Sequence, residues 1–423
     1  MPSNSGFDLA LAAESLRDDV RRLARINATM HPHEAEDNAA ELRRRIAKTA
    51  KQIAFETAPR MDVVKDDWIV LGSVAAWNIF IDWRAFDRIP LDGYISISDL
   101  ARLLNAQESL PEYPPSSSPP ANSSPAPSPT LTHSRISPFY IGTNPLSDTC
   151  IVAVGNAMKP FSQWPEYFRA YGRREPVGPG FTPFSFGWGH APLPPWEVKV
   201  LYPLYASAFM RTMRSKQIAG GDMVLTGEEA LCDLEWVGIE ALTMDENAAV
   251  VVDVGGGLGQ LIHLVLRDVV GLLPRQCVLQ DRREVIEEAR AELMRHGLDE
   301  VVVMEHDFHH EQPIKGALVY LLRRILCDYS DEMATGILRR LAEALPADKP
   351  NARVIIIEER LLEVPTPENC IVDLVMMNLG GMLRNYDKYR EIVAAAGLTV
   401  VGYHIQDGNP ICAVECVKIE GAA

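Results

Sequence analysis

One segment, residues 250–259, constrains the fold of this 423-residue chain more than any other. Three valines lead into Asp253-Val-Gly-Gly-Gly-Leu-Gly259, a pattern typical of a buried parallel strand that runs into a glycine-rich turn and opens a helix. Glycine adopts backbone dihedrals that a side chain forbids and lets a ligand approach the backbone. The spacing differs from the G-x-G-x-x-G of dinucleotide-binding proteins. The alternative is a tight turn whose glycines serve only the backbone.

From about residue 247 onward, predicted strands alternate with predicted helices. The strands are expected at residues 249–253, 277–280, 301–305, 317–321 and 353–358, with helices that include 283–296 and 332–344. Such alternation predicts an α/β fold with a doubly wound parallel sheet. Residues 400–405 and 411–419, separated by a turn, predict a terminal antiparallel hairpin.

The first part of the chain, residues 1–246, is predicted to be mostly helical. Apolar stripes predict helices over residues 8–58 and 67–88, and residues 91–105 read as the strand, serine cap and short helix of a winged helix. Residues 111–137 are rich in Pro and Ser, and we expect a disordered insertion there, in the wing. We therefore expect two domains, a dimerisation and substrate domain over 1–246 and a catalytic domain over 247–423. The alternative for the first helices is that they pack only on their own domain.

Composition excludes several classes of function. The net charge of −16 argues against nucleic-acid and anionic-membrane partners, since phosphate binding needs clustered Lys and Arg. No apolar run is long enough for a membrane span, and the N-terminus lacks a signal-peptide core. Seven cysteines without a C-x-x-C pair indicate a reducing compartment, so we expect a cytoplasmic protein. Cys412 and Cys416 have no further ligands nearby in the sequence, so no metal is expected.

Residues with ligand chemistry follow three successive predicted strands. Asp253 ends the first, Asp281 ends the second, and Asp307 and Phe308 follow the third. A carboxylate accepts hydrogen bonds from two vicinal hydroxyls, while an acid beside an aromatic ring suits an adenine. Because the carboxyl ends of parallel strands meet at one edge of a sheet, the sequence predicts a binding crevice there.

These motifs resemble a known family. Residues 250–419 are similar to the catalytic domain of the class I, plant-caffeate-type and fungal O-methyltransferases, which use S-adenosylmethionine (SAM). The resemblance rests on Asp253-Val-Gly-Gly-Gly-Leu-Gly, Val278-Leu-Gln-Asp281, His306-Asp-Phe308, Tyr320-Leu-Leu-Arg-Arg-Ile-Leu-Cys-Asp-Tyr-Ser-Asp-Glu332 and Gly380-Gly381. The N-terminal helices and winged-helix-like segment are similar to the family's dimerisation domain, which implies a homodimer. The resemblance leaves out only residues 111–137.

The resemblance implies SAM as the cofactor and assigns residues to it. The implied cofactor-binding residues are Asp253, Gly255 and Gly257 for the amino-acid part, Asp281 for the ribose, Asp307 and Phe308 for the adenine, Arg323 nearby, and Tyr329 where the family commonly carries Trp.

The catalytic machinery of the family is altered in this chain. The family uses a His as general base, and Cys327 occupies that position; the usual pKa of a thiol, near 8.5, makes it an odd base. Leu383 stands where a Glu normally orients the His. A second carboxylate, Glu359, and the acceptor-side Asn378 are kept. Two losses in one machinery, with the cofactor motifs retained, indicate a changed reaction.

Three interpretations remain open. The favoured one is an enzyme of fungal secondary metabolism that binds SAM without transferring its methyl group and catalyses a pericyclic cyclisation, dehydration or isomerisation of an apolar, polyketide-derived intermediate. A fixed sulfonium charge stabilises charge that develops on the substrate, and an apolar pocket holds a flexible polyene in a reactive conformation. The second is a SAM-dependent O-methyltransferase for a phenolic or enolic acceptor. The third is a non-catalytic protein that binds SAM or a partner.

Candidate residues follow from these interpretations. The candidate catalytic residues are Cys327, Asp328, His190 and Glu359, and the candidate substrate-lining residues are Met213, Leu374, Met377, Asn378 and Leu383. Each has a structural alternative. In these alternatives, Cys327 only fills space, Asp328 only caps the next helix, and His190 only faces solvent in a Pro-rich loop. The aromatic and Met side chains of residues 184–213 line a pocket or fill a core.

Overall fold

The computed structural model describes residues 7–29, 32–108, 130–176, 178–219, 223–406 and 408–419. The chain divides into two compact units, Met1–Ser134 and Arg135–Ala423. The sequence-based boundary at residue 246 lies inside the second unit, at the point where helices give way to alternating strands and helices. Among the described residues, none of the helices combines the length and the hydropathy that a bilayer crossing requires.

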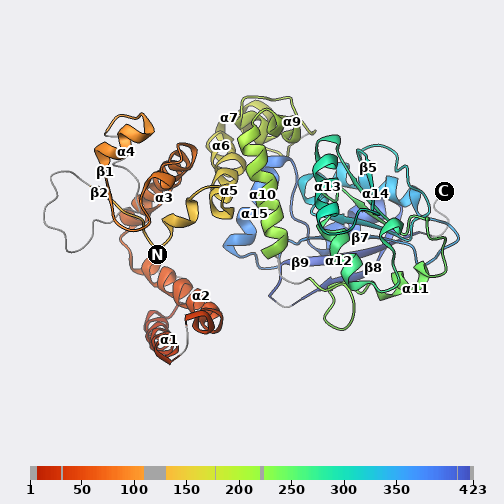
Figure 1. The fold of residues 1–423 in the computed structure, drawn as a ribbon, viewed down its shortest axis with the longest axis horizontal. Coiled ribbons are helices and arrows are strands. Elements are labelled where there is room, and N and C mark those ends of the chain that lie inside the picture. Colours follow the sequence, from red (N-terminus) through yellow and green to blue (C-terminus); the bar gives the residue numbers. More distant parts are fainter. Residues whose placement is uncertain are drawn as a thin grey trace. The chain divides into compact units, whose positions relative to one another are not determined.

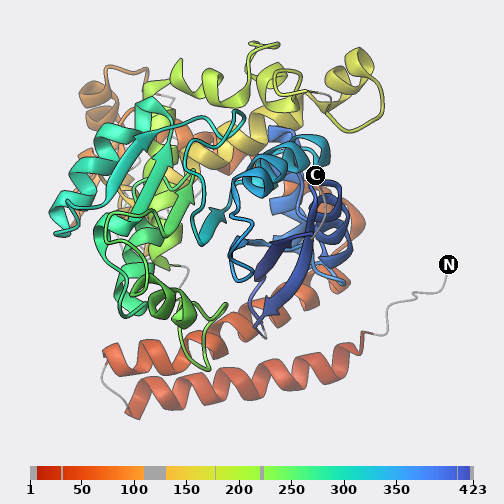
Figure 2. The same cartoon turned by 90° about the vertical axis from the view of Figure 1, so that its right-hand side faces the viewer.

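The first unit begins with long helices. Helices α1 (Leu9–Thr29) and α2 (Pro32–Thr57) lie side by side (Figure 2), and an ion pair between Asp19 and Arg45 joins them. Helix α3 (Arg60–Asp82) and the 3-10 turn η1 (Phe86–Arg88) follow. The helical prediction for residues 8–58 is thus confirmed wherever the chain is described.

A small wing-like element completes the first unit. Strand β1 (Ile95–Ser96) pairs antiparallel with β2 (Thr130–Leu131), and Ser96 caps α4 (Ile97–Leu104) by accepting a hydrogen bond from the backbone of Asp99. Most of the predicted disordered insertion, residues 111–129, lies outside the described residues. Its last part, residues 130–137, was predicted wrongly: Leu131 is buried against the sheet partner Ile95, and a 3-10 turn, η3 (Ser137–Tyr140), begins at residue 137.

The second unit contains a seven-stranded sheet in the order β5-β4-β3-β6-β7-β9-β8. Its parallel strands are β3 (Val251–Val254), β4 (Cys277–Asp281), β5 (Val302–Glu305), β6 (Val319–Arg323) and β7 (Arg353–Glu359). Strands β8 (Leu398–Ile405) and β9 (Ile411–Lys418) form the antiparallel hairpin. These findings confirm the predicted strands and hairpin. The strand order reverses at β3, which puts a ligand crevice beyond its carboxyl end.

Helices cover both faces of this sheet (Figure 1). On one face lie α11 (Glu235–Ala241), α12 (Gln260–Asp268) and α13 (Arg283–Arg295), with the short η5 (Pro274–Gln276) before β4. On the other lie α14 (Asp331–Ala344) and α16 (Tyr386–Ala395). Both sets bury apolar side chains against strands that read as continuous apolar runs, as expected of a doubly wound fold.

A helical layer precedes the sheet in the same unit. It comprises α5 (Pro145–Ala153), the π-helical turn η4 (Val154–Met158), α6 (Lys159–Ser162), α7 (Trp164–Tyr171), α8 (Pro183–Gly187), α9 (Pro195–Val200) and α10 (Pro203–Ala219). Helix α15 (Pro367–Leu379), inserted after β7, packs against α8 and η4 (Figure 1). Aromatic residues of α8 to α10 are therefore held close to the loops that follow β6 and β7.

Candidate active site

The glycine-rich turn after β3 has the backbone geometry that only glycine accepts easily. Gly255 and Gly257 have φ angles of +72° and +59°. The amides of Gly255 and Gly256 donate to the carbonyl oxygen of Gln280, at 2.8 and 3.0 Å, which ties the turn to β4. A Cβ at position 256 would lie 2.5 Å from Oδ2 of Asp253. The turn therefore leaves space next to the Asp253 carboxylate and keeps the backbone accessible.

Asp281 locks the same turn from the end of β4. Its Oδ2 accepts a hydrogen bond from the amide of Gly257 at 2.8 Å, and its Oδ1 accepts one from Arg282 at 2.7 Å. Burial raises the pKa of Asp281, and these two amides oppose that shift. Because each carboxylate oxygen has a second lone pair, Asp281 can still accept from a ligand's hydroxyl groups.

Three buried polar atoms at this edge have no hydrogen-bond partner within the described residues. They are Oδ2 of Asp253 near the carboxyl end of β3, Nη1 of Arg323 at the end of β6, and Nε2 of His306 after β5. Burial raises the pKa of Asp253 to about 7, against the attraction of Arg323. Buried polar atoms are almost always paired in native proteins. An anionic oxygen and two nitrogens left over at one sheet edge therefore fit a polar ligand.

An aromatic wall stands over the glycine turn. The ring centroid of Tyr329 lies 5.8 Å from that of Phe308 and 5.0 Å from that of His309. A Cβ at position 255 would meet Ile325 at 2.6 Å and Phe308 at 3.3 Å. Asp307 turns back on its own loop, where its Oδ1 accepts from the amide of His309 at 2.9 Å.

The turn η6 (Leu326–Asp328) is fixed by a carboxylate that the sequence did not single out. Oε1 of the fully buried Glu358 accepts from the amides of Ile325, Leu326 and Cys327, at 3.0, 2.5 and 3.2 Å. Oε2 accepts from the hydroxyl of Tyr389 at 3.0 Å. The only sequence signal was a second acid beside Glu359 at the end of β7. Successive side chains of a strand point to opposite faces of the sheet, and of these two acids Glu358 is the buried one.

Two further contacts hold η6 from the opposite side. Arg384, fully buried, donates to the carbonyl oxygens of Leu326 and Tyr329, each at 2.7 Å, and pairs with Asp331 at 2.9 Å. Gly381 packs so closely on the backbone of residues 327–329 that any Cβ there would overlap the carbonyl oxygen of Cys327. The turn therefore has little freedom to move.

The side chains that η6 presents differ in charge. Burial, together with the charges of Glu358 and Asp328, raises the pKa of the Cys327 thiol well above its usual value, so the thiol stays neutral and donates at most a weak hydrogen bond. Asp328 is partly exposed. Burial raises its pKa, the charge of Lys199 opposes that shift, and Glu358 adds to it. Asp328 is thus the titratable group that η6 offers.

Lys199 is a second functional candidate that the sequence analysis missed. Its Nζ has no hydrogen-bond partner and lies 3.6 Å from the ring centroid of Trp196 and 3.8 Å from that of Phe209. Burial lowers its pKa, and the attraction of Asp328 opposes the shift. A lysine on a short Pro-initiated helix gives no signal in the sequence, because one wall of its cage comes from the next helix, α10.

Comparison with known proteins identifies the family of this chain. Residues 182–399 match the O-methyltransferase domain family. The methyltransferase cfoD of Aspergillus candidus is 33% identical over 385 residues, which cover 89% of this chain and 93% of that protein. The chain belongs to the O-methyltransferase family. Among solved structures, OxaC with SAH and oxaline superimposes with a TM-score of 0.76 at 17% identity, covering 97% of this chain and 100% of that one. LepI with SAM gives 0.70 at 19%, covering 96% and 100%.

The remaining predicted catalytic residues, His190 and Glu359, form no hydrogen bond with η6 within the described residues. His190 shares a hydrogen bond of 2.8 Å with the hydroxyl of Tyr202, and its backbone amide donates to the carbonyl oxygen of Ser185. Glu359 is partly buried and accepts a long hydrogen bond, 3.4 Å, from the side chain of Asn369.

The predicted substrate-lining residues are spread over two helices and a loop. Met213 on α10 and Met377 on α15 are partly buried, whereas Leu374 is exposed. Asn378 is fully buried, and its amide is used inside the protein: it donates to the carbonyl oxygen of Asn156 and accepts from the indole of Trp164, both at 2.8 Å. Leu383 is buried beside Arg384. Asn378 therefore joins α15 to η4 and α7.

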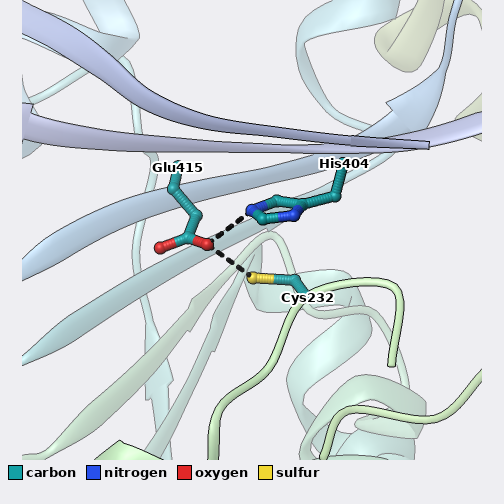
Figure 3. A group of neighbouring side chains, drawn as sticks. All are labelled: Cys232, His404 and Glu415. Carbon is teal, nitrogen blue, oxygen red and sulfur yellow. Dashed lines mark hydrogen bonds and ion pairs between the residues drawn. The ribbon is translucent and has the colours of Figure 1, made fainter. Parts of the chain in front are cut away.

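One group of metal-donor side chains is found in the described part of the chain, away from the glycine turn. Cys232, His404 and Glu415 place their donor atoms within 4.8 Å of one another (Figure 3). Oε1 of Glu415 lies 2.6 Å from His404 and accepts from the Cys232 thiol at 3.4 Å, while Oε2 pairs with Arg353 at 3.1 Å. Burial and Glu415 raise the pKa of Cys232, which keeps it protonated. We interpret this group as a hydrogen-bonded brace between the hairpin and the loop before α11.

Replacing Asp253 with Asn is expected to stabilise the cofactor-free protein at pH 8. The folded pKa of about 7 exceeds the usual 3.8, so the contribution of Asp253 to stability is present below pH 3.8 and is lost as the pH rises through 7. At pH 8 the buried carboxylate, whose Oδ2 has no hydrogen-bond partner, costs about 1–3 kcal/mol. Thermal unfolding at pH 8 should show a higher Tm for Asp253→Asn. The control Asp281→Asn, whose oxygens both hold backbone amides, should lower it; a lower Tm for Asp253→Asn would contradict this account.

Gly381→Ala is expected to destabilise the protein, because the new methyl group forces η6 away from Glu358 and Arg384. Overpacking of this kind costs about 1–3 kcal/mol. Denaturant unfolding compares it with Gly336→Ala on α14, where the nearest atom is the mobile end of Arg340 at 3.3 Å. That control should be neutral or slightly stabilising. Equal stabilities of the two variants would show that η6 tolerates displacement.

Proposed function

We propose that this protein is a SAM-dependent methyltransferase that acts on an acidic O–H or N–H group of a small, largely apolar secondary metabolite. The observation that carries the proposal is Asp328, a titratable carboxyl on the turn where the family keeps its base. Curated relatives that match most of the chain, such as cfoD, are named methyltransferases, and this supports transfer of the methyl group.

The cofactor is SAM, and the edge of the sheet offers groups that fit it. Asp253 offers an unpartnered carboxylate oxygen to the ammonium of the amino-acid part, and the turn at Gly255 and Gly257 leaves space for that part. Asp281 offers its remaining lone pairs to the ribose hydroxyls, and Phe308 an aromatic edge to the adenine. When bound, SAM would supply a methyl group attached to a positively charged sulfur. The methyl would go to an oxygen or nitrogen of the acceptor, and the sulfur would be left as a neutral thioether.

The residues of η6 determine which acceptors are accessible. The Cys327 thiol is held neutral, so it takes no proton from an alcohol. Asp328 has a pKa raised by burial, which suits a general base near neutral pH. A carboxylate of this kind deprotonates only an acceptor of modest pKa. An enol, a phenol or an acidic amide therefore fits, and a simple alcohol does not.

A second candidate is the reaction favoured from the sequence alone: a pericyclic cyclisation, dehydration or isomerisation of a polyketide-derived intermediate without methyl transfer. The specific observation in its favour is the loss of both the His and the Glu of the family, at Cys327 and Leu383, beside an intact cofactor cradle. In that case Asp328 and Lys199 would serve as hydrogen-bonding and charged groups for a rearranging substrate.

The deciding experiment supplies methyl-labelled SAM and the metabolites of a host that lacks this enzyme. Label in a new product is expected, and Asp328→Asn should lower its rate at least about 100-fold, since general bases contribute 10²–10⁴. SAM affinity should stay unchanged, and Glu332→Gln, the same charge change at an exposed site four residues on, should keep the rate. A new unlabelled product, isomeric with its precursor or lighter by one water, would establish the second candidate instead.

We also propose that the protein is a homodimer through its N-terminal helices. Helix α3 exposes a run of large apolar side chains: Met61, Trp68, Ile69, Val70 and Leu71. Contiguous exposed apolar surface of this kind is typical of an interface. Light scattering should give twice the chain mass of 46.9 kDa. The double variant Trp68→Glu and Leu71→Glu should be monomeric, and Leu91→Glu, exposed outside α3, should not. A monomeric wild-type protein would contradict the proposal.

A further inference from the structure

The Lys199 ammonium is incompletely compensated by the protein itself. The side chain is 4% exposed, Nζ has no hydrogen-bond partner, and no carboxylate of the described residues lies within the 4.0 Å of an ion pair. A buried charge without a partner costs several kcal/mol. Cation–π contacts with Trp196 and Phe209 return about 0.5–2 kcal/mol each at most. The energetics therefore leave room for an anion.

This lysine adjoins the catalytic turn. Trp196, from the same helix α9, interacts with the hydroxyl of Tyr329, the residue after Asp328, and opposes the rise that burial causes in the pKa of that hydroxyl. The guanidinium carbon of Arg282 lies 5.8 Å from the Trp196 ring centroid and adds a second positive charge. Tyr329 in turn contacts Phe308 over the glycine turn. The cage around Lys199 and the cofactor edge thus share the wall formed by Trp196 and Tyr329.

The chemistry of the cage selects among anions. A carboxylate or phosphate is best recognised by the planar, two-pronged guanidinium of Arg, whereas a lysine offers a single point of charge. Flat aromatic faces on two sides favour a flat, conjugated partner. The four-carbon stem of the lysine lets Nζ turn toward an acceptor beside Asp328.

We propose that Lys199 binds the acceptor as an oxyanion conjugated to a planar π-system, an enolate or a phenolate, with Trp196 and Phe209 against its apolar face. This inference rests on the proposed function for the position of the acceptor, and it names the substrate class. Lys199 fixes the charge, while Asp328 takes the proton from the reacting group. Lys199 and the bound acceptor would each favour the charged form of the other, because opposite charges attract.

The test measures binding rather than turnover, with the protein saturated by SAH. The probes are 4-nitrophenol, whose absorbance reports ionisation, and 2-acetylcyclohexane-1,3-dione, an acidic enol, each compared with its neutral methyl ether. Wild type should bind at least one of the anions at least tenfold more tightly than its ether, and the two probes distinguish a phenolate site from an enolate site. Lys199→Met should lose that preference while keeping its SAH affinity, which also shows that it folds.

Lys159→Met is the matched control, because Lys159 also stacks on an aromatic ring, 3.5 Å from the Trp188 centroid, but is exposed. It should keep the preference for anions. Bound 4-nitrophenol should ionise at lower pH in wild type and Lys159→Met than in Lys199→Met. An unchanged preference in Lys199→Met, or failure of both anions to bind wild type, would overturn the inference. Binding of this kind without any methyl transfer would overturn only the proposed function.

Discussion

The candidate site depends on one buried carboxylate, Glu358, onto which three successive backbone amides converge. Without it, the amides of residues 325–327 would be buried donors with no acceptor, and each such loss costs about 1–3 kcal/mol. The same carboxylate, through Tyr389, ties the turn to α16. Arg384 and Gly381 hold it from the other side. The position of Cys327, Asp328 and Tyr329 is therefore set by the end of β7 rather than by the turn's own sequence.

Around this rigid turn the protein keeps several polar groups that it does not satisfy. Asp253, Arg323 and His306 lie at the cofactor edge, and Lys199 lies in its aromatic cage. Natural proteins retain such destabilising groups where function needs them. At the cofactor edge these groups are one carboxylate and two nitrogen donors, which suit a zwitterionic cofactor. In the cage the group is a cation, which suits an anionic acceptor. The folded chain therefore leaves buried polar groups unpaired at two places, and each place suits a different ligand.

The altered family positions also have a physical interpretation. A neutral thiol at 327 and an apolar side chain at 383 stand where the family carries its base and the acid that orients it. The backbone around them is tied together, since the amide of Met382 donates to the carbonyl oxygen of Cys327 at 3.0 Å. In the proposed function, Asp328, one residue further on, takes over the titratable role. Its pKa depends on burial and on Lys199 and Glu358, from two different elements. A change of base therefore needs no change of scaffold.

The sequence by itself determined the sheet and the glycine turn, because strand alternation and glycine runs are local patterns. From the strand-end acids it also predicted a ligand crevice, and it named Asp328 as a candidate residue. Only the tertiary structure decided that Glu358 rather than Glu359 holds η6, that Asn378 is used by Asn156 and Trp164, and that Lys199 stands unpaired between Trp196 and Phe209. Residues 130 and 131 likewise gain order from pairing with β1. Burial and charge pairing are sums over elements far apart in the chain, and no local pattern carries that information.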